Sequence, residues 1–228
     1  MANAIGTQMS QEQIHEEKRT AEVVFGGAFS ESLLSGGAVV LAIIGLVGAF
    51  PGLLLSISVI GLGGALLLEG ASISARFYNL LSETAKDKFS IAELGLGTTA
   101  ESFAGAAGVT LGILSLLRVM PVILIPSGII VIGGCLILGA GANARLNHLG
   151  IGIRMEEHPH FRAIAREAVL ASTSLQLLVG LGGITLGILA LSGIEPLILS
   201  LTGVLVLSSS MLLSGSSIAS RMASLFFL

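Results

Sequence analysis

One seven-residue pattern occurs three times along the chain, as AVVLAII at 38–44, GVTLGIL at 108–114 and GITLGIL at 183–189. Each copy carries two small residues four positions apart and begins thirteen residues before a proline. A pattern kept at fixed spacing in three copies predicts an internal threefold repeat. The prolines are Pro51, Pro121 and Pro196, and the small residues are Ala38, Ala42, Gly108, Gly112, Gly183 and Gly187.

The repeat extends to polar residues on either side of each proline. Twenty residues before the prolines stand Glu31, Glu101 and Gln176, and twenty-four or twenty-five residues after them stand Arg76, Arg145 and Arg221. A glycine precedes each arginine by six residues, at Gly70, Gly139 and Gly215. Each copy therefore predicts two helices of similar length that are joined by a short turn at the proline.

The three copies are apolar enough to require lipid as their solvent. Hydrophobic residues make up 53% of the chain and charged residues 11%, with a mean hydropathy of +0.96, whereas soluble domains carry about 25% charged residues. Residues 33–50 form an uncharged run of eighteen, close to the roughly 20 residues that a membrane-spanning helix needs. We therefore expect an all-α integral membrane protein with six transmembrane helices, arranged as three tandem helical hairpins with a pseudo-threefold internal repeat.

Polar stretches set the expected limits of the hairpins. Residues 1–19 are a polar N-terminal lead, and the first hairpin repeat is expected at 20–80. The second is expected at 81–146 and the third at 147–228. Each of these two has a preceding segment in which apolar and charged residues mix, as they do in segments that lie on a membrane surface.

Basic residues indicate the orientation in the membrane. Ten of the eleven lysines and arginines fall on the side that carries both termini, most of them outside the apolar runs, in the linking stretches 77–97 and 146–168 or near the chain ends. Only Arg118 falls in a turn on the opposite side. Since Lys and Arg in short loops favour the cytoplasmic side, we expect a protein of the cytoplasmic membrane with both termini in the cytoplasm.

Small residues are the expected packing chemistry. The chain has 31 glycines, no tryptophan and a single tyrosine, and helices in lipid associate through close backbone approach at small residues. The candidate packing residues are the six of the repeated pattern together with Gly70, Gly139 and Gly215. Membrane lipid is the first expected partner, and further copies of the chain or other membrane subunits are the second.

The repeated acids, glutamine and arginines form a candidate polar ring. A residue about twenty positions before the proline and one about twenty-four positions after it lie at the same depth in the membrane, because the two helices of a hairpin run in opposite directions. We therefore expect Glu31 to pair with Arg76 and Glu101 with Arg145. In the third copy the pair would be a hydrogen bond between Gln176 and Arg221. The ring would be a cytoplasmic gate or ion site, or alternatively a set of interfacial clamps whose arginines reach the headgroups.

Glu69 is a separate candidate for an intramembrane ion or proton site. It lies within the apolar stretch LLLEGAS, seven residues before Arg76, and the equivalent places hold Leu138 and Ser214. An ionisable residue inside a transmembrane helix is a functional hypothesis by default. The structural alternative is neutralisation by Arg76 or by an arginine of a neighbouring chain.

The sequence offers no basis for catalysis, cofactor binding or metal binding. It contains no nucleotide-binding glycine loop, nucleophile elbow or HExxH pair. His158 and His160, with His148 nearby, lack a cysteine cluster, so a solvated interfacial segment explains them better than a metal site. We therefore expect no enzyme activity, no cofactor and no metal. A net charge of −3 without a basic block argues against a nucleic-acid partner.

Two functions remain open after these exclusions. The favoured one is a non-catalytic, structural or accessory membrane subunit that oligomerises or packs within a larger membrane complex, because the chain has little soluble mass and no ligand motif. The alternative is a transporter or channel that passes a proton, an ion or a small solute through the pseudo-threefold bundle. Glu69 and the polar ring would then be its polar elements.

Overall fold

The structure is helical throughout the part of the chain that can be described. The computed structural model describes the backbone at 26–27, 29–83, 88–154 and 159–226, and the side chains at 26–27, 29–71, 100–140 and 174–216. Within these ranges the chain forms six helices and no strand. They are α1, described over Phe29–Leu46, α2 (Pro51–Glu83), α3 (Lys88–Leu116), α4 (Pro121–Arg154), α5 (Pro159–Leu191) and α6 (Pro196–Phe226).

Length and composition make most of the described helices suited to cross a membrane. Among the described residues, five helices contain an apolar segment long enough to cross a bilayer, and the apolar segment of α3, Ala100–Leu116, is shorter. The expectation of an all-helical, membrane-embedded protein is confirmed at this level. The five segments are Phe29–Leu46, Pro51–Ala71, Pro121–Ala140, Ser174–Leu191 and Pro196–Ser216.

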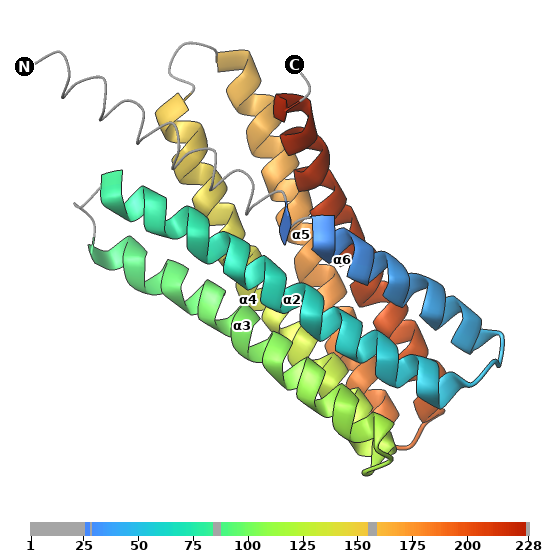
Figure 1. Cartoon of the computed structure of the whole chain (residues 1–228). Helices are drawn as coiled ribbons and strands as arrows, with labels where there is room; N and C mark the ends of the chain where they lie inside the picture. Colours follow the sequence, from blue (N-terminus) through green and yellow to red (C-terminus); the bar gives the residue numbers. More distant parts are fainter. Residues whose placement is uncertain (1–25, 28, 84–87, 155–158, 227–228) are drawn as a thin grey trace, which may run out of the picture.

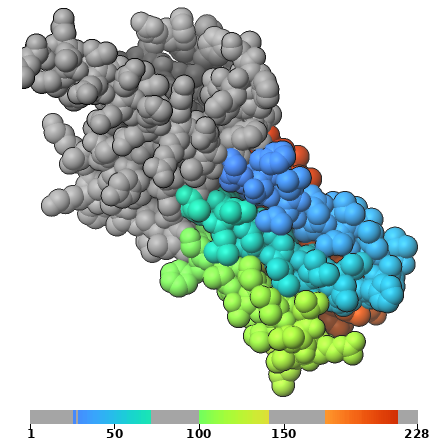
Figure 2. Space-filling view, viewed as in Figure 1, coloured from blue at the N-terminus to red at the C-terminus, as the bar shows by residue number. Residues whose placement is uncertain are grey.

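Large apolar side chains cover the outside of the bundle. Figure 2 shows α1, α2 and α3 side by side on one face. Val47 and Phe50 of the first turn and Phe103 of α3 are 84%, 80% and 77% exposed. Apolar surface of this extent is unfavourable in water and suits contact with lipid chains.

Several helices continue well beyond their apolar segments. α2 runs past Arg76 to Glu83, and α3 already begins at Lys88. In the same way α4 continues to Arg154 and α5 begins at Pro159. The linking stretches 77–97 and 146–168 are therefore mostly helical extensions of the spans, because polar residues are compatible with a helix wherever water can solvate them.

Three four-residue turns join the helices at one end of the bundle, as Figure 1 shows (47–50, 117–120 and 192–195). The residue three positions before each proline has a positive φ: 100° at Gly48, 62° at Arg118 and 86° at Gly193. The residue directly before each proline also has a positive φ, and these residues are Phe50, Met120 and Glu195. The next helix then starts on the proline, whose fixed φ and missing N–H suit the first helical position.

Backbone hydrogen bonds explain the first of these positive φ angles. The Gly48 N–H donates to the Gly45 carbonyl at 3.0 Å, and the Ala49 N–H donates to the Ile44 carbonyl at 3.3 Å. This pair of bonds is the Schellman arrangement, which closes a helix and requires a left-handed residue, usually glycine. Arg118 takes that position in the second turn, where its N–H donates to the Ser115 carbonyl at 2.9 Å.

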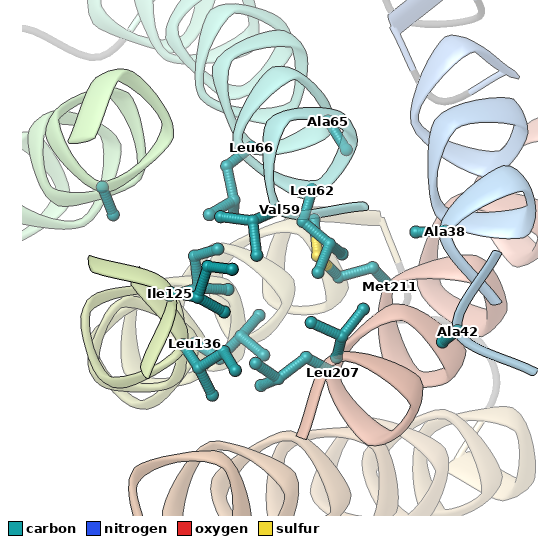
Figure 3. Close-up of a cluster of buried hydrophobic side chains, with 14 of the residues drawn as sticks. Ala38, Ala42, Val59, Leu62, Ala65, Leu66, Ile125, Leu136, Leu207 and Met211 are labelled. Atoms are coloured by element: carbon teal, nitrogen blue, oxygen red, sulfur yellow. The ribbon is translucent and has the colours of Figure 1, made fainter. Parts of the chain in front are cut away.

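The helices α2, α4 and α6 contact one another and surround a common apolar core. In each of them, the residues four, eight, eleven and fifteen positions after the initial proline are buried. Alternating spacings of four and three are those of a heptad seam. Figure 3 shows side chains from the three helices converging on one centre. These residues, which we call the central column, are Leu55, Val59, Leu62, Leu66, Ile125, Ile129, Ile132, Leu136, Ser200, Val204, Leu207 and Met211.

The other three helices surround the central column, and Ala38 and Ala42 of α1 and Ala104 of α3 belong to the same buried cluster. α3 contacts both α2 and α4, and α5 contacts both α4 and α6. α1 lies against α2 and α6: a Cβ atom placed on Gly64 of α2 would be 3.5 Å from Leu34 Cδ1, and one placed on Gly45 would be 2.7 Å from Leu201 Cδ2 of α6. Each outer helix therefore contacts two inner ones.

Glycine pairs allow the backbone of α3 to contact that of α2, and the backbone of α5 to contact that of α4. A Cβ on Gly63 would lie 2.7 Å from the Gly105 carbonyl oxygen, and one on Gly133 would lie 2.8 Å from the Gly180 carbonyl oxygen. Gly63 and Gly133 stand twelve residues after their prolines, and Gly105 and Gly180 stand sixteen residues before theirs. The two interfaces are thus built from the same positions of the repeated pattern.

Replacing Arg118 by glycine should stabilise the fold. A left-handed conformation costs a residue with a side chain about 1–2 kcal/mol, and Gly48 and Gly193 avoid that cost in the other two turns. We expect Arg118→Gly to raise the free energy of unfolding by about 1 kcal/mol, measured by unfolding in mixed detergent micelles. Gly48→Ala is the matched control and should lower it, because alanine is strained at a φ of 100°. No atom lies within 4 Å of the added Cβ, so a steric clash would not contribute. Equal stabilities for all three proteins would contradict the argument.

Adding a methyl group at Gly63 should separate α2 from α3. Its Cβ would lie 2.5 Å from the Val109 backbone nitrogen, which cannot move unless the helix moves with it. We expect Gly63→Ala to lower the free energy of unfolding by about 1–3 kcal/mol. The adjacent variant Gly64→Ala meets only Leu34 Cδ1, at an ordinary 3.5 Å, and should be neutral in the same unfolding experiment. A neutral Gly63→Ala would show that this contact is not tight.

Candidate functional site

Two of the outer helices place a carboxyl group at the same position of a buried stripe. On α1 the positions twenty, sixteen, thirteen, nine and six before the proline face the interior, and the side chains after the first are small. Glu31 is the first of these positions on α1, and Glu101 is its equivalent on α3; they are 1% and 3% exposed. Gln176 takes the same position on α5 and is half-buried. The stripe explains why an acid at its end points into the bundle rather than into lipid.

Glu69 extends the central column by one further layer. It stands eighteen residues after Pro51, three beyond Leu66, and is 5% exposed. Counted from the prolines, the equivalent positions on the other inner helices hold Gly139 and Ser214. Counting from the arginines points to Leu138 on α4, but that side chain is 62% exposed and lies off the column. The layer that follows four layers of almost entirely apolar side chains therefore contains a carboxyl group and two small residues.

The three carboxyl groups share one electrostatic neighbourhood. A charge on Glu69 would act on both Glu31 and Glu101, and a charge on Glu101 would act on Glu31. The packing explains this proximity, because α1 and α3 both lie against α2, which carries Glu69. We call Glu31, Glu69 and Glu101 the carboxyl cluster.

Polar atoms in and beside the cluster lack a protein partner. Within the described part of the structure, Glu31 Oε1, Glu101 Oε2 and Ser35 Oγ are buried and have no hydrogen-bond partner. Ser35 is fully buried and lies one helical turn from Glu31 on the same face of α1. Unpartnered buried oxygen atoms are rare in native proteins and indicate a place for a proton, a water molecule or an ion.

α4 supplies the side of the cluster that faces Glu101. A Cβ on Gly139 would lie 2.7 Å from Glu101 Oε1, so the carboxyl group occupies the space that a side chain there would fill. The thiol of Cys135, one turn earlier on α4, is buried and lies within range of charges on Glu69 and Glu101. α4 thus brings no charge of its own to the described part of the site.

Several other hydroxyl groups in the described part of the bundle have hydrogen-bond partners. Ser58 donates to the Leu54 carbonyl at 2.8 Å, Thr110 to the Ala106 carbonyl at 2.8 Å and Ser208 to the Val204 carbonyl at 2.6 Å. Ser56 and Ser115 share a buried hydrogen bond of 2.9 Å between α2 and α3. Ser35 differs from these residues, which is a reason to assign it to the cluster.

The predicted polar ring is described only in part. The side chains of Arg76, Arg145 and Arg221 lie outside the described residues, and so do the predicted pairings with Glu31, Glu101 and Gln176. What the structure does bring together is Glu31, Glu101 and Glu69. The sequence interpretation kept Glu69 apart from the ring, whereas the fold places it beside two members of that ring.

The predicted packing residues lie on inward faces. Ala38 and Ala42 are 2% and 0% exposed. A Cβ on Gly108 would lie 3.1 Å from Gly63 Cα, and one on Gly112 or Gly187 would lie 2.6 Å from Cγ1 of Ile60 or Ile130. Gly183 faces Leu207 at 2.8 Å, Gly70 faces Ser102 Oγ at 3.0 Å, and Gly215 is buried.

Sequence analysis missed Ser35 and Cys135 as neighbours of the cluster. One signal was present: Ser35 follows Glu31 by four residues on a helix, which places both on one face. Cys135 gave no such signal, because its proximity to Glu69 and Glu101 depends on how α4 packs against α2 and α3.

The carboxyl groups of the cluster are the titratable groups that the described site offers. Among the described residues, no three His, Cys, Asp or Glu side chains are grouped closely enough to hold a metal ion. His148, His158 and His160 lie outside the described side chains. Carboxyl groups in a water-poor environment exchange a proton with a change of one charge each, which is the chemistry that this arrangement offers.

Comparison with known proteins adds no assignment to this geometry. No family model, no curated protein and no solved structure matches the chain.

Removing the Ser35 hydroxyl should stabilise the protein. An unpartnered buried hydroxyl costs about 1–3 kcal/mol, so we expect Ser35→Ala to raise the free energy of unfolding by about 1 kcal/mol. Ser58→Ala is the matched control, since Ser58 is equally buried but its hydroxyl is hydrogen-bonded. Unfolding in mixed micelles measures both variants. A loss of stability in Ser35→Ala would show that this hydroxyl binds a group that stabilises the fold.

Proposed function

We propose that this protein is a membrane transport protein that moves protons, with Glu31, Glu69 and Glu101 as its proton-binding site. The observation that carries the proposal is the burial of three carboxyl groups, from three neighbouring helices, in one electrostatic neighbourhood. Ionisable residues are expensive inside a membrane bundle and occur there mainly on ion or proton pathways. A purely structural bundle would pack better with apolar residues at these three positions.

A proton fits the cluster better than a metal ion does. Three carboxylates shielded from water repel one another strongly, and this repulsion is relieved when one or more of them is protonated. The unpartnered atoms Glu31 Oε1 and Glu101 Oε2 supply positions at which a proton, or a water molecule carrying it, is stabilised. The described residues offer no three-ligand metal group as an alternative.

The proposal includes a closed pseudo-threefold bundle of three hairpins. Support comes from the three turns, whose positive φ angles fall at equivalent positions, and from the central column, whose layers repeat at equal distances from the three prolines. The third copy has Gln176 instead of an acid. The proton-binding groups are therefore concentrated on α1, α2 and α3.

The cluster would lie towards the cytoplasmic side. The basic residues favour cytoplasmic termini, and the carboxyl groups stand fifteen to eighteen residues along their helices from the helix ends at the turns, or about 23–27 Å. The central column lies between the cluster and the turns, so it would be the barrier that a proton crosses during transport. Placement in the cytoplasmic membrane and assembly into oligomers belong to the same proposal.

The proposed function predicts proton flux that depends on Glu69. Purified protein reconstituted in liposomes with an internal pH-sensitive dye should dissipate an imposed pH gradient. Glu69→Gln should reduce the flux to that of liposomes without protein, because an amide cannot exchange a proton. Glu195→Gln, in the turn at the far end of the bundle, is the matched control and should transport like the unmodified protein.

Three outcomes of this experiment would contradict the proposal. Flux that follows a sodium gradient but not a pH gradient would assign the site to a metal cation. Undiminished proton flux in Glu69→Gln would remove the cluster from the pathway. Absence of any flux, together with oligomers or a co-purifying membrane complex, would favour the structural or accessory subunit that the sequence also allows.

A further inference from the structure

Gly139 occupies an unusual position on α4. It stands eighteen residues after Pro121, in the layer that Glu69 occupies on α2. The four column positions before it on α4 hold bulky side chains, Ile125, Ile129, Ile132 and Leu136, all buried. On α4 the central column therefore changes from large side chains to a glycine at the level of the carboxyl cluster.

The carboxyl group of Glu101 fills the space above Gly139. A Cβ on Gly139 would lie 2.7 Å from Glu101 Oε1 and 3.7 Å from Glu101 Cδ. The other end of the same side chain passes a second glycine, since a Cβ on Gly70 of α2 would lie 3.4 Å from Glu101 Cβ. Glu101 thus extends from α2 to α4 across two surfaces that lack side chains.

Gly139 differs from the glycines that join the helices. A Cβ on Gly63, Gly105 or Gly180 would come within 2.7 Å of a backbone atom of a neighbouring helix. Among the glycines whose surroundings the structure describes, Gly139 alone has a carboxyl oxygen as the nearest atom to an added Cβ. A side chain at Gly139 would move the carboxyl group and leave the helices in place.

We propose that Gly139 is a positioning residue for the proton site, because its missing side chain admits the Glu101 carboxyl group to the layer of Glu69. This inference rests on the proposed function for its role in transport, while the placement of the carboxyl group can be measured independently. Gly139 acts through Glu101 and exchanges no proton itself. Transport then depends on the shape of α4 as well as on the three acids.

Infrared spectroscopy of the reconstituted protein tests the placement. The carboxyl band of Glu101 is identified by its loss in Glu101→Gln. Gly139→Ala should shift this band and lower the proton flux, whereas Gly134→Ala should change neither. Gly134 is the matched control because it lies on the same helix and no atom is found within 4 Å of its added Cβ.

A double variant separates positioning from a structural effect. Aspartate is one methylene group shorter than glutamate, so Gly139→Ala combined with Glu101→Asp returns room for both the methyl group and the carboxyl group. We expect the double variant to recover flux that Gly139→Ala loses. A general packing defect at Gly139 would not be rescued by shortening one acid.

The outcomes separate this inference from the proposed function. Three results would each overturn the role of Gly139. The first is an unchanged Glu101 band in Gly139→Ala, and the second is failure of the aspartate substitution to restore flux when the unmodified protein transports protons. The third is loss of folded protein in Gly139→Ala but not in Gly134→Ala. Absence of flux in the unmodified protein would overturn the proposed function. A shifted Glu101 band would still support the placement of the carboxyl group in that case.

Discussion

Close contact between backbones at glycine is the constraint on which the rest of the structure depends. Helices in lipid gain no hydrophobic stabilisation from association, so they depend on dispersion contacts that require small residues at the interface. Gly63 with Gly105, and Gly133 with Gly180, allow α3 and α5 to lie directly on α2 and α4. These contacts fix the height of α3 against α2, and with it the level at which Glu101 meets Glu69.

The carboxyl cluster is a local exception to the rule that organises the bundle. The central column is almost entirely apolar, and the inward stripes of the outer helices are almost entirely small. Both patterns end in an acid on the same side of the molecule, at Glu69 for the column and at Glu31 and Glu101 for the stripes. Burial of ionisable groups is costly inside a membrane bundle, so the packing of apolar and small side chains does not by itself favour any of the three acids.

The three copies of the sequence pattern differ in their turn residues and in their polar residues. Turn geometry is retained even where the second copy has Arg118 in place of glycine. The acid is not retained, because Gln176 replaces it in the third copy. α1 meets α6 through Gly45 and Leu201, while α2 meets α3 through the bonded hydroxyls of Ser56 and Ser115. The turn geometry is thus the same in all three copies, whereas the carboxyl group is present in only two of them.

The sequence by itself determined the solvent, the helices and the turns. Long uncharged runs can satisfy their backbone in lipid only as helices, and each proline marks the start of one. Only the tertiary structure decided which polar residues meet. Spacing along one hairpin predicted acids beside arginines, whereas Glu69 meets Glu31 and Glu101 because α1 and α3 pack on the same inner helix. Periodicity reports which face of a helix is buried, but the neighbour that covers this face is chosen by contacts between helices distant in sequence.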